Sequence, residues 1–230
     1  MVQEHLVLLF LKLAVAASLA SVLTRSSSFQ RMLLRDERTL LQRVRMAVVC
    51  SLIFGAGVLT RVGTRGTYQA VDLGMEGSLV MGMLGGYVMG LLSGVLISLP
   101  AMANGETLSM LLFAAVGVMG GVLRDLAPDK EFLWTFTPFP DLALFRVLRK
   151  GDLRLPFFSI ACVGVILLCE GLRSLMADLF PTKGTLVFSL QHQWSSDPPW
   201  MFGAIYISTL FATVLPIKRS EEHTSELQSL

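Results

Sequence analysis

The chain has 230 residues, of which 53% are hydrophobic and 16% are charged, with a formal net charge of +2. Its mean hydropathy is +0.64. These values exclude an ordinary soluble globular domain, and the apolar residues form runs long enough to cross about 30 Å of hydrocarbon. We therefore predict an all-α polytopic membrane bundle with five to six spanning helices.

Cysteine and histidine give no pattern for a redox or metal centre. Cys50, Cys162 and Cys169 lie in apolar runs without paired spacing, which favours small buried hydrophobic thiols over a redox site. The three histidines are isolated in the sequence. We therefore predict no catalytic residue, no metal site and no cofactor.

The first predicted span is Leu6–Thr24, with Lys12 as its single charge. We expect Lys12 to extend toward the interface; a signal peptide is the alternative, weakened because the charge lies inside the apolar run. Six arginines occur in the following segment, Arg25–Arg45, against two acidic residues. Short basic loops stay cytoplasmic, so this pattern favours the inside over a nucleic-acid patch.

The second and third predicted spans are Met46–Thr60 and Ser78–Leu99, joined by the polar connector Arg61–Gly77. In the third span, glycines recur every four residues. On one continuous helix this spacing predicts a single small-residue face suited to close backbone packing in lipid. This helix-packing seam consists of Gly82, Gly86, Gly90 and Gly94.

A turn at Asn104–Thr107 precedes the fourth predicted span, Thr107–Leu123, which is also rich in small residues. Two adjacent spans with small-residue faces suggest a close hairpin. Glu106 is expected to interact with the dipole of the following helix. The next segment, Arg124–Leu155, contains aromatic residues around prolines and an amphipathic stretch, Asp141–Lys150, which we expect on the membrane surface.

The last two predicted spans lie in Pro156–Phe180 and Trp200–Ile217, separated by the polar connector Pro181–Pro199. The tail Arg219–Ser229 resembles a translated sequencing adapter. We therefore expect residues 1–218 to form one membrane domain and residues 219–230 to be artefactual, with the coding sequence interrupted near Lys218.

The number of crossings is in conflict with the loop charges. Six crossings would place Arg25–Arg45 and Arg124–Leu155 on opposite sides, although each carries six Lys or Arg residues. One non-crossing element in the glycine-rich region, such as a re-entrant hairpin, would put both segments inside. We favour five full crossings with the N-terminus outside; six crossings with both termini cytoplasmic is the simpler alternative.

The region Asp72–Asp125 resembles the LytS-type five-transmembrane receptor region of bacterial sensor histidine kinases. The similarity lies in the run Gly86-Tyr-Val-Met-Gly90-Leu-Leu-Ser-Gly94, the turn Asn104-Gly-Glu-Thr107 and the small-residue segment Gly117–Leu123. It extends more loosely from Leu6 to Ile217 through the order of spans. The family's usual arginines on either side of the glycine run are replaced by Asp72-Leu-Gly74 and Leu99-Pro-Ala101.

This resemblance implies the sensory region of a two-component system in the bacterial plasma membrane, with signals related to cell-wall organisation. A kinase domain following the membrane region would form a homodimer and pass phosphate to a cytoplasmic response regulator. The motifs of such a domain do not occur in these residues. The expected partners are therefore the lipid bilayer and, for a full-length parent, a second copy through the kinase and the response regulator; no nucleic acid is expected.

Charged residues in or beside the predicted spans are the candidate signal-binding positions. Each has a structural alternative. Glu170 and Arg173 share a helix face and could neutralise each other, and Asp72 and Glu76 could cap a helix. Arg61 and Arg65 could contact carboxylates or extend toward the interface.

Three function classes remain open after these observations. The leading hypothesis is a sensor in which a signal biases two packings of the glycine seam. The alternative is a small-solute transporter or its substrate-binding membrane subunit, because glycine-rich spans and intramembrane charges occur there too. A ligand-free assembly protein is a third class that the sequence leaves open.

The five-crossing arrangement predicts where new cysteines become accessible. In a background without the native cysteines, Ser27→Cys and Gly151→Cys should both react with a membrane-impermeant maleimide only from the cytoplasmic side, because both lie in the basic segments. The measurement is labelling of intact cells against inverted vesicles. Labelling from opposite sides contradicts this arrangement and supports six crossings.

Overall fold

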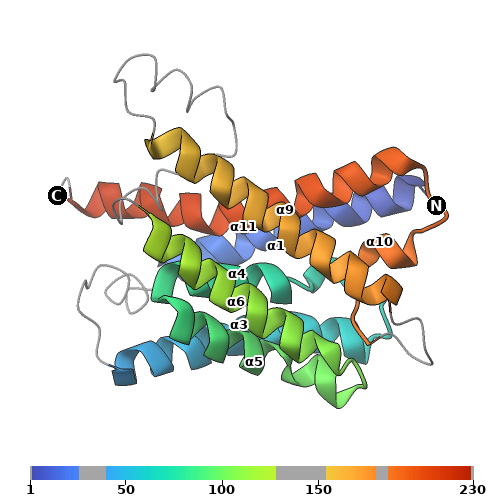
Figure 1. Ribbon diagram of the computed structural model, residues 1–230, viewed down its shortest axis with the longest axis horizontal. Coiled ribbons are helices and arrows are strands. Elements are labelled where there is room, and N and C mark those ends of the chain that lie inside the picture. The colour runs from blue at the N-terminus through green and yellow to red at the C-terminus, as the bar shows by residue number, and fades with distance from the viewer. Residues whose placement is uncertain (1, 26–39, 128–153, 180–185, 229–230) are drawn as a thin grey trace.

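The computed structural model describes residues 2–25, 40–127, 154–179 and 186–228. All regular elements in these ranges are helical, as predicted (Figure 1). Among them, five helices are long and apolar enough to cross a membrane. They are α1 (Val2–Arg25), α3 (Leu40–Gly63), α6 (Leu108–Leu126), α9 (Arg154–Leu179) and α11 (Pro199–Gln228).

These five helices correspond to five of the six predicted apolar runs, and the multi-pass helical bundle is confirmed. The helix α3 is longer at both ends than the predicted span Met46–Thr60. Arg61 belongs to its last turn rather than to the predicted polar connector. The helix α11 includes the suspected adapter segment, whose origin stays a prediction. The amphipathic stretch Asp141–Lys150 lies outside the described residues.

The glycine-rich third span is not one continuous helix, so this prediction is wrong. The chain forms α4 (Gly74–Gly85), breaks at Gly86 and continues as α5 (Tyr87–Ala103). Gly86 has φ +88°, a backbone conformation that glycine adopts without steric cost. The helix α4 is about 18 Å long at 1.5 Å per residue, too short to cross the hydrocarbon alone.

The break at Gly86 lets α4 run back beside α5, and α6 packs against both (Figure 1). A Cβ added at Gly82 would collide with the backbone of α6 at Gly117, Gly120 and Gly121. A Cβ added at Gly90 would likewise collide with backbone atoms, those of Gly117 in α6 and Gly82 in α4. The glycines therefore do mediate close helix packing, but between three helices rather than along one face of a single helix.

Gly94 also belongs to this packing, against the α6 backbone at Phe113 and Ala114. Gly86 does not, because a Cβ there would meet only the Arg124 side chain, at 3.4 Å. Its role is the chain reversal. The predicted close hairpin between the glycine-rich span and the next one is present as α5 and α6.

The helix directions bear on the conflict over the loop charges. The helices α1, α6 and α11 run one way along the bundle, and α3, α5 and α9 run the other way (Figure 1). Residues 64–85, which include the 3-10 turn η1 (Gln69–Val71) and α4, lead the chain back between α3 and α5. The helix ends that flank the two basic segments therefore lie at the same end of the bundle.

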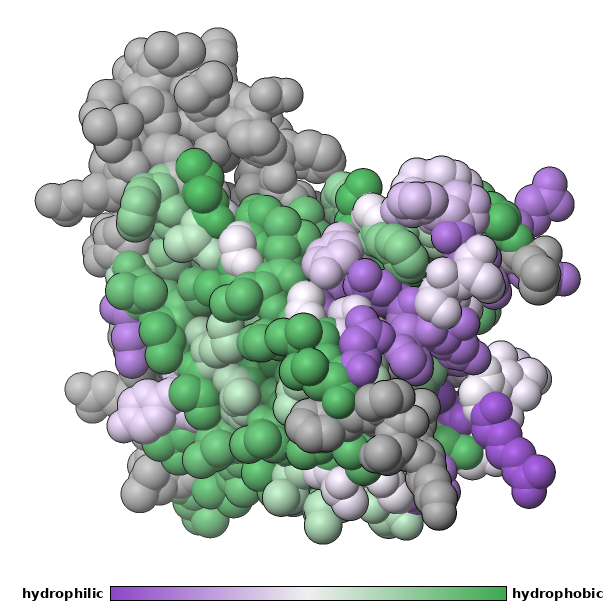
Figure 2. Space-filling model, turned by 45° about the vertical axis from the view of Figure 1, so that its right-hand side comes forward, coloured by the Kyte–Doolittle hydropathy of each residue, from purple (hydrophilic) through white to green (hydrophobic). Residues whose placement is uncertain are grey.

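The outer surface of the bundle is suited to contact with lipid. Large apolar side chains are exposed on every long helix, including Phe10, Leu52, Leu111, Phe157 and Ile207. Figure 2 shows hydrophobic residues over much of one flank and hydrophilic residues gathered toward the end that carries the N-terminus. A membrane around the flank would cover these exposed apolar groups.

The close contact at Gly90 gives a prediction for stability. Gly90→Ala places a methyl group against the backbone of α6 and should cost about 1–3 kcal/mol, a fall in Tm of about 5 °C. Thermal unfolding in detergent, followed with a thiol-reactive dye that reports exposure of Cys50, Cys162 and Cys169, measures it.

Gly203→Ala is the matched control, because a Cβ at Gly203 meets nothing within 4 Å. Its Tm should stay unchanged or rise, since alanine favours the helix by about 1 kcal/mol. Equal effects of the two substitutions would contradict the packing role of Gly90.

Candidate functional site

Seven charged residues that are buried within the described part of the chain form one cluster. The members come from helices far apart in the sequence, and each residue is no more than 7% exposed. This buried charge cluster consists of Lys12, Arg61, Asp72, Glu76, Glu106, Glu170 and Arg173. Their gathering follows from the membrane environment, where a buried charge is tolerated only beside an opposite charge or hydrogen-bonding groups.

Arg61, in the last turn of α3, joins two carboxylates in the cluster. Its Nη1 and Nη2 atoms donate to Oε1 and Oε2 of Glu106 at 2.6 and 2.8 Å, and its Nε lies 2.5 Å from Oδ2 of Asp72. The planar guanidinium matches a carboxylate in this two-bond geometry. Ser109 donates a further bond to Glu106 at 3.3 Å. Arg61 therefore fixes the α5–α6 turn and the start of α4 to α3.

Asp72 and Glu76 lie at the start of α4. Asp72 precedes Leu73, the N-cap residue of α4, and its Oδ1 accepts a hydrogen bond from the Gly74 N–H at 3.0 Å while its other oxygen faces Arg61. Glu76 Oε1 lies 2.5 Å from Nζ of Lys12 on α1, with both side chains 2% exposed. Because α4 begins inside the bundle, its first turn can present carboxylates at this depth.

Glu170 and Arg173 of α9 form the third part of the cluster. Their nearest charged atoms are 3.6 Å apart, and Glu170 is fully buried. Thr209 of α11 donates to Glu170 Oε2 at 3.2 Å. Arg173 also interacts electrostatically with Glu76, Asp72 and Arg61. The three parts therefore form a single electrostatic unit.

Phe188, just before α10 (Leu190–Gln193), covers the cluster from one side. Its ring centre is 4.1 Å from the Arg61 guanidinium carbon and 5.9 Å from that of Arg173. Cations placed over an aromatic face in this way are attracted to the ring. The segment is held in place by a hydrogen bond from the Leu108 N–H to the Leu186 carbonyl at 3.1 Å.

A second group of polar contacts anchors the connection around α10. His5 Nδ1 of α1 lies 2.6 Å from Asp197 Oδ2, and the His5 ring stacks on Trp194 at 4.1 Å. His192 Nδ1 lies 2.7 Å from Asp178 Oδ1 of α9, in an exposed position. These contacts tie the segment that carries Phe188 to α1 and α9.

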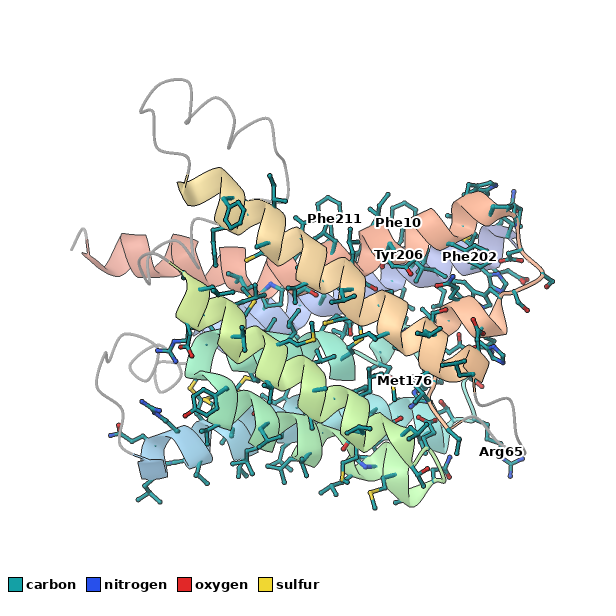
Figure 3. The ribbon with its side chains drawn as sticks, viewed as in Figure 1. Phe10, Arg65, Met176, Phe202, Tyr206 and Phe211 are labelled. Carbon is teal, nitrogen blue, oxygen red and sulfur yellow. The ribbon has the colours of Figure 1, made fainter. Side chains whose placement is uncertain are left out.

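Five of the six predicted charged candidates meet in the cluster: Arg61, Asp72, Glu76, Glu170 and Arg173. The sixth, Arg65, does not. It is exposed in the turn after α3 and extends away from the bundle (Figure 3). Of the two alternatives for Arg61, the structure shows carboxylate contacts rather than extension toward the interface, and Asp72 combines a hydrogen bond from the first turn of α4 with an ion pair.

Sequence reasoning missed Lys12 and Glu106. The expectation that Lys12 extends toward the interface is wrong, because it is 1% exposed and pairs with Glu76. Glu106 lies beside α6 as expected, but its main partner is Arg61, 45 residues earlier. The available signal was charge balance, because an isolated lysine in an apolar span requires a carboxylate from another span.

Comparisons with known proteins leave the site to be interpreted from its own geometry. No family model, no curated protein and no solved structure matches the chain. Within the described residues, no group of three or more His, Cys, Asp or Glu side chains is placed to hold a metal ion. What the site offers is buried charge, hydroxyl groups and an aromatic cover.

The position of Arg61 between two carboxylates predicts a large effect on stability. Arg61→Gln leaves Asp72 and Glu106 buried without their shared cation and should cost about 3–5 kcal/mol, or about 10 °C in Tm. Thermal unfolding in detergent measures it.

Asp178→Asn is the control, because it breaks an ion pair whose side chains are 40% and 59% exposed. It should change stability by less than about 1 kcal/mol. A small effect of Arg61→Gln, comparable to that of the control, would show that the cluster does not hold the helices together.

Proposed function

We propose that this chain is the membrane-embedded sensory region of a two-component histidine kinase in the bacterial plasma membrane. The observation that carries the proposal is the hydrogen bond from Thr209 to Glu170. Through it, the last helix of the bundle contacts the buried charge cluster directly. A change of charge or ligand at the cluster would therefore act on the helix that precedes any C-terminal output domain.

The position of the cluster in the bundle supports this proposal. The end of α3, which contains Arg61, and the turn between α5 and α6, which contains Glu106, lie opposite to the helix ends that flank the two basic segments (Figure 1). By the positive-inside rule, the basic segments are cytoplasmic. The cluster would then face the outer half of the membrane, where an external signal arrives, while α11 leads toward the cytoplasm.

Transmission requires an element with two arrangements. The glycine contacts between α4, α5 and α6 allow close backbone approach, and the Gly86 reversal leaves α4 as a short separate helix. The cluster holds the N-terminal end of α4 through Asp72 and Glu76. A signal that weakens these ion pairs would free α4 to move against α5 and α6. The output would pass through a dimeric kinase to a response regulator.

A transporter of small solutes is the second candidate, favoured by the interrupted path of residues 64–85. Transporters often bind substrates where a broken helix begins near the membrane midplane. Here α4 begins inside the bundle beside Lys12 and Glu76. The coding sequence that follows Ile217 in the source genome discriminates between the two, because a kinase sequence supports the sensor and a stop codon supports the transporter.

The sensor proposal predicts that Thr209 affects an attached kinase. In a chimaera of residues 1–217 with a dimeric cytoplasmic histidine kinase, Thr209→Val removes the hydroxyl contact to Glu170 and keeps the side-chain shape. Basal autophosphorylation in inverted vesicles should change by about fivefold, a typical coupling magnitude.

Thr60→Val is the matched control, because the Thr60 hydroxyl bonds only its own helix, at the Ala56 carbonyl. It should leave autophosphorylation unchanged. Wild-type activity in a well-expressed Thr209→Val chimaera contradicts the transmission route, and solute uptake into liposomes by residues 1–217 alone favours the transporter.

A further inference from the structure

The buried charge cluster contains one more negative than positive charge. Its basic members are Lys12, Arg61 and Arg173, and its acidic members are Asp72, Glu76, Glu106 and Glu170. With three positive and four negative groups, the formal net charge is −1. The Asp197 side chain, which is 6% exposed, lies outside the cluster and pairs with His5. An uncompensated charge in a low-dielectric interior is costly, so the cluster is electrostatically suited to take up one more positive charge.

The hydrogen-bond pattern indicates where this charge belongs. Within the described residues, Glu170 Oε1, both carboxylate oxygens of Glu76 and Arg173 Nε have no hydrogen-bond partner. Glu76 retains Lys12 at 2.5 Å, and Asp72 and Glu106 share Arg61. Glu170 has the weakest set of contacts, a single hydroxyl at 3.2 Å and a cation at 3.6 Å. Glu170 is therefore the least compensated of the four carboxylates.

The two carboxylate oxygens of Glu170 differ in their contacts. Oε2 accepts the hydrogen bond from Thr209, whereas Oε1 has no hydrogen-bond partner among the described residues and lies 3.6 Å from Arg173 Nη2. A carboxylate oxygen is a suitable ligand for a small hard cation. The charged and titratable groups around Glu170 and Arg173 also come from every element of the cluster. Besides its seven members, Cys169 of α9 and Tyr206 of α11 interact electrostatically with Glu170.

We propose that the cluster binds one monovalent cation at the Glu170 carboxylate. The ligand is a single positive charge, supplied by an alkali-metal ion or by a proton, and in either case it brings the cluster to neutrality. The role of this ion as a signal rests on the proposed sensory function, whereas its binding does not. The binding test below therefore uses the chain without a kinase, so that failure of either proposal can be recognised separately.

The test measures Tm of the full chain in detergent with the thiol-reactive dye. One series replaces choline chloride by NaCl or KCl at constant ionic strength and pH 8, and the other varies pH from 8.5 to 5.5 without alkali metal. We expect one of the two series to raise the wild-type Tm by about 5 °C, the effect of a ligand well above its Kd. A rise with salt identifies a metal ion, and a rise only on acidification identifies a proton.

Glu170→Gln should abolish this rise, because it removes the surplus charge while keeping a polar side chain. Without the cation its Tm should equal or exceed that of the wild type, whereas a purely structural ion pair with Arg173 predicts a loss under all conditions. Asp178→Asn, which alters an exposed carboxylate, should keep the wild-type response. His5→Gln should keep the acid response, since His5 lies outside the cluster beside Asp197.

Thr209→Val provides a second variant that leaves every charge in place. Because the Thr209 hydroxyl competes with the cation for Glu170, its loss should lower the half-saturating cation concentration by about tenfold. An unchanged midpoint, an unaltered wild-type Tm in both series, or a wild-type response in Glu170→Gln would each overturn the proposal.

Discussion

A guanidinium buried between two carboxylates is the interaction on which the arrangement of this bundle depends. Arg61 reaches Glu106 with two hydrogen bonds and Asp72 with a third contact, and all three side chains are nearly inaccessible to solvent. In lipid, the hydrophobic effect does not drive helices together, so directional polar contacts and close packing determine which helices are neighbours. Arg61 thereby fixes three separate parts of the chain: the end of α3, the entry to α4 and the turn between α5 and α6.

The break at Gly86 makes this network geometrically feasible. A continuous helix over Ser78–Leu99 would leave the preceding acidic residues outside the membrane, beside the polar connector. Instead, the reversal at Gly86 makes α4 a short helix whose first turn lies inside the bundle, where Glu76 meets Lys12 near the middle of α1. The glycines of α4, α5 and α6 then allow the three helices to pack at backbone contact. Packing and charge pairing therefore depend on each other.

The sequence was sufficient to predict the helical membrane class and the approximate position of most spans, because hydropathy over about 20 residues is a local property. It was also sufficient to single out Arg61, Asp72, Glu76, Glu170 and Arg173, since ionisable residues in or beside apolar runs are rare. It did not reveal the break at Gly86. Glycines four residues apart fit one face of a helix equally well, and nothing local distinguishes a packing glycine from one with positive φ.

Partner choice was the other property that the sequence concealed. Lys12 pairs with a residue 64 positions later and Glu106 with one 45 positions earlier, and such pairings depend on which helices become neighbours.

These long-range pairings also couple the charges of the cluster to one another. Because Arg61 is shared by two carboxylates and Arg173 interacts electrostatically with Glu76 and Asp72, a change at one carboxylate alters the electrostatic balance of the cluster. Glu170 contacts α11 through Thr209, so the least compensated carboxylate is also the one joined to the last helix. A change of charge at Glu170 would therefore act directly on the hydrogen bond that joins this carboxylate to α11.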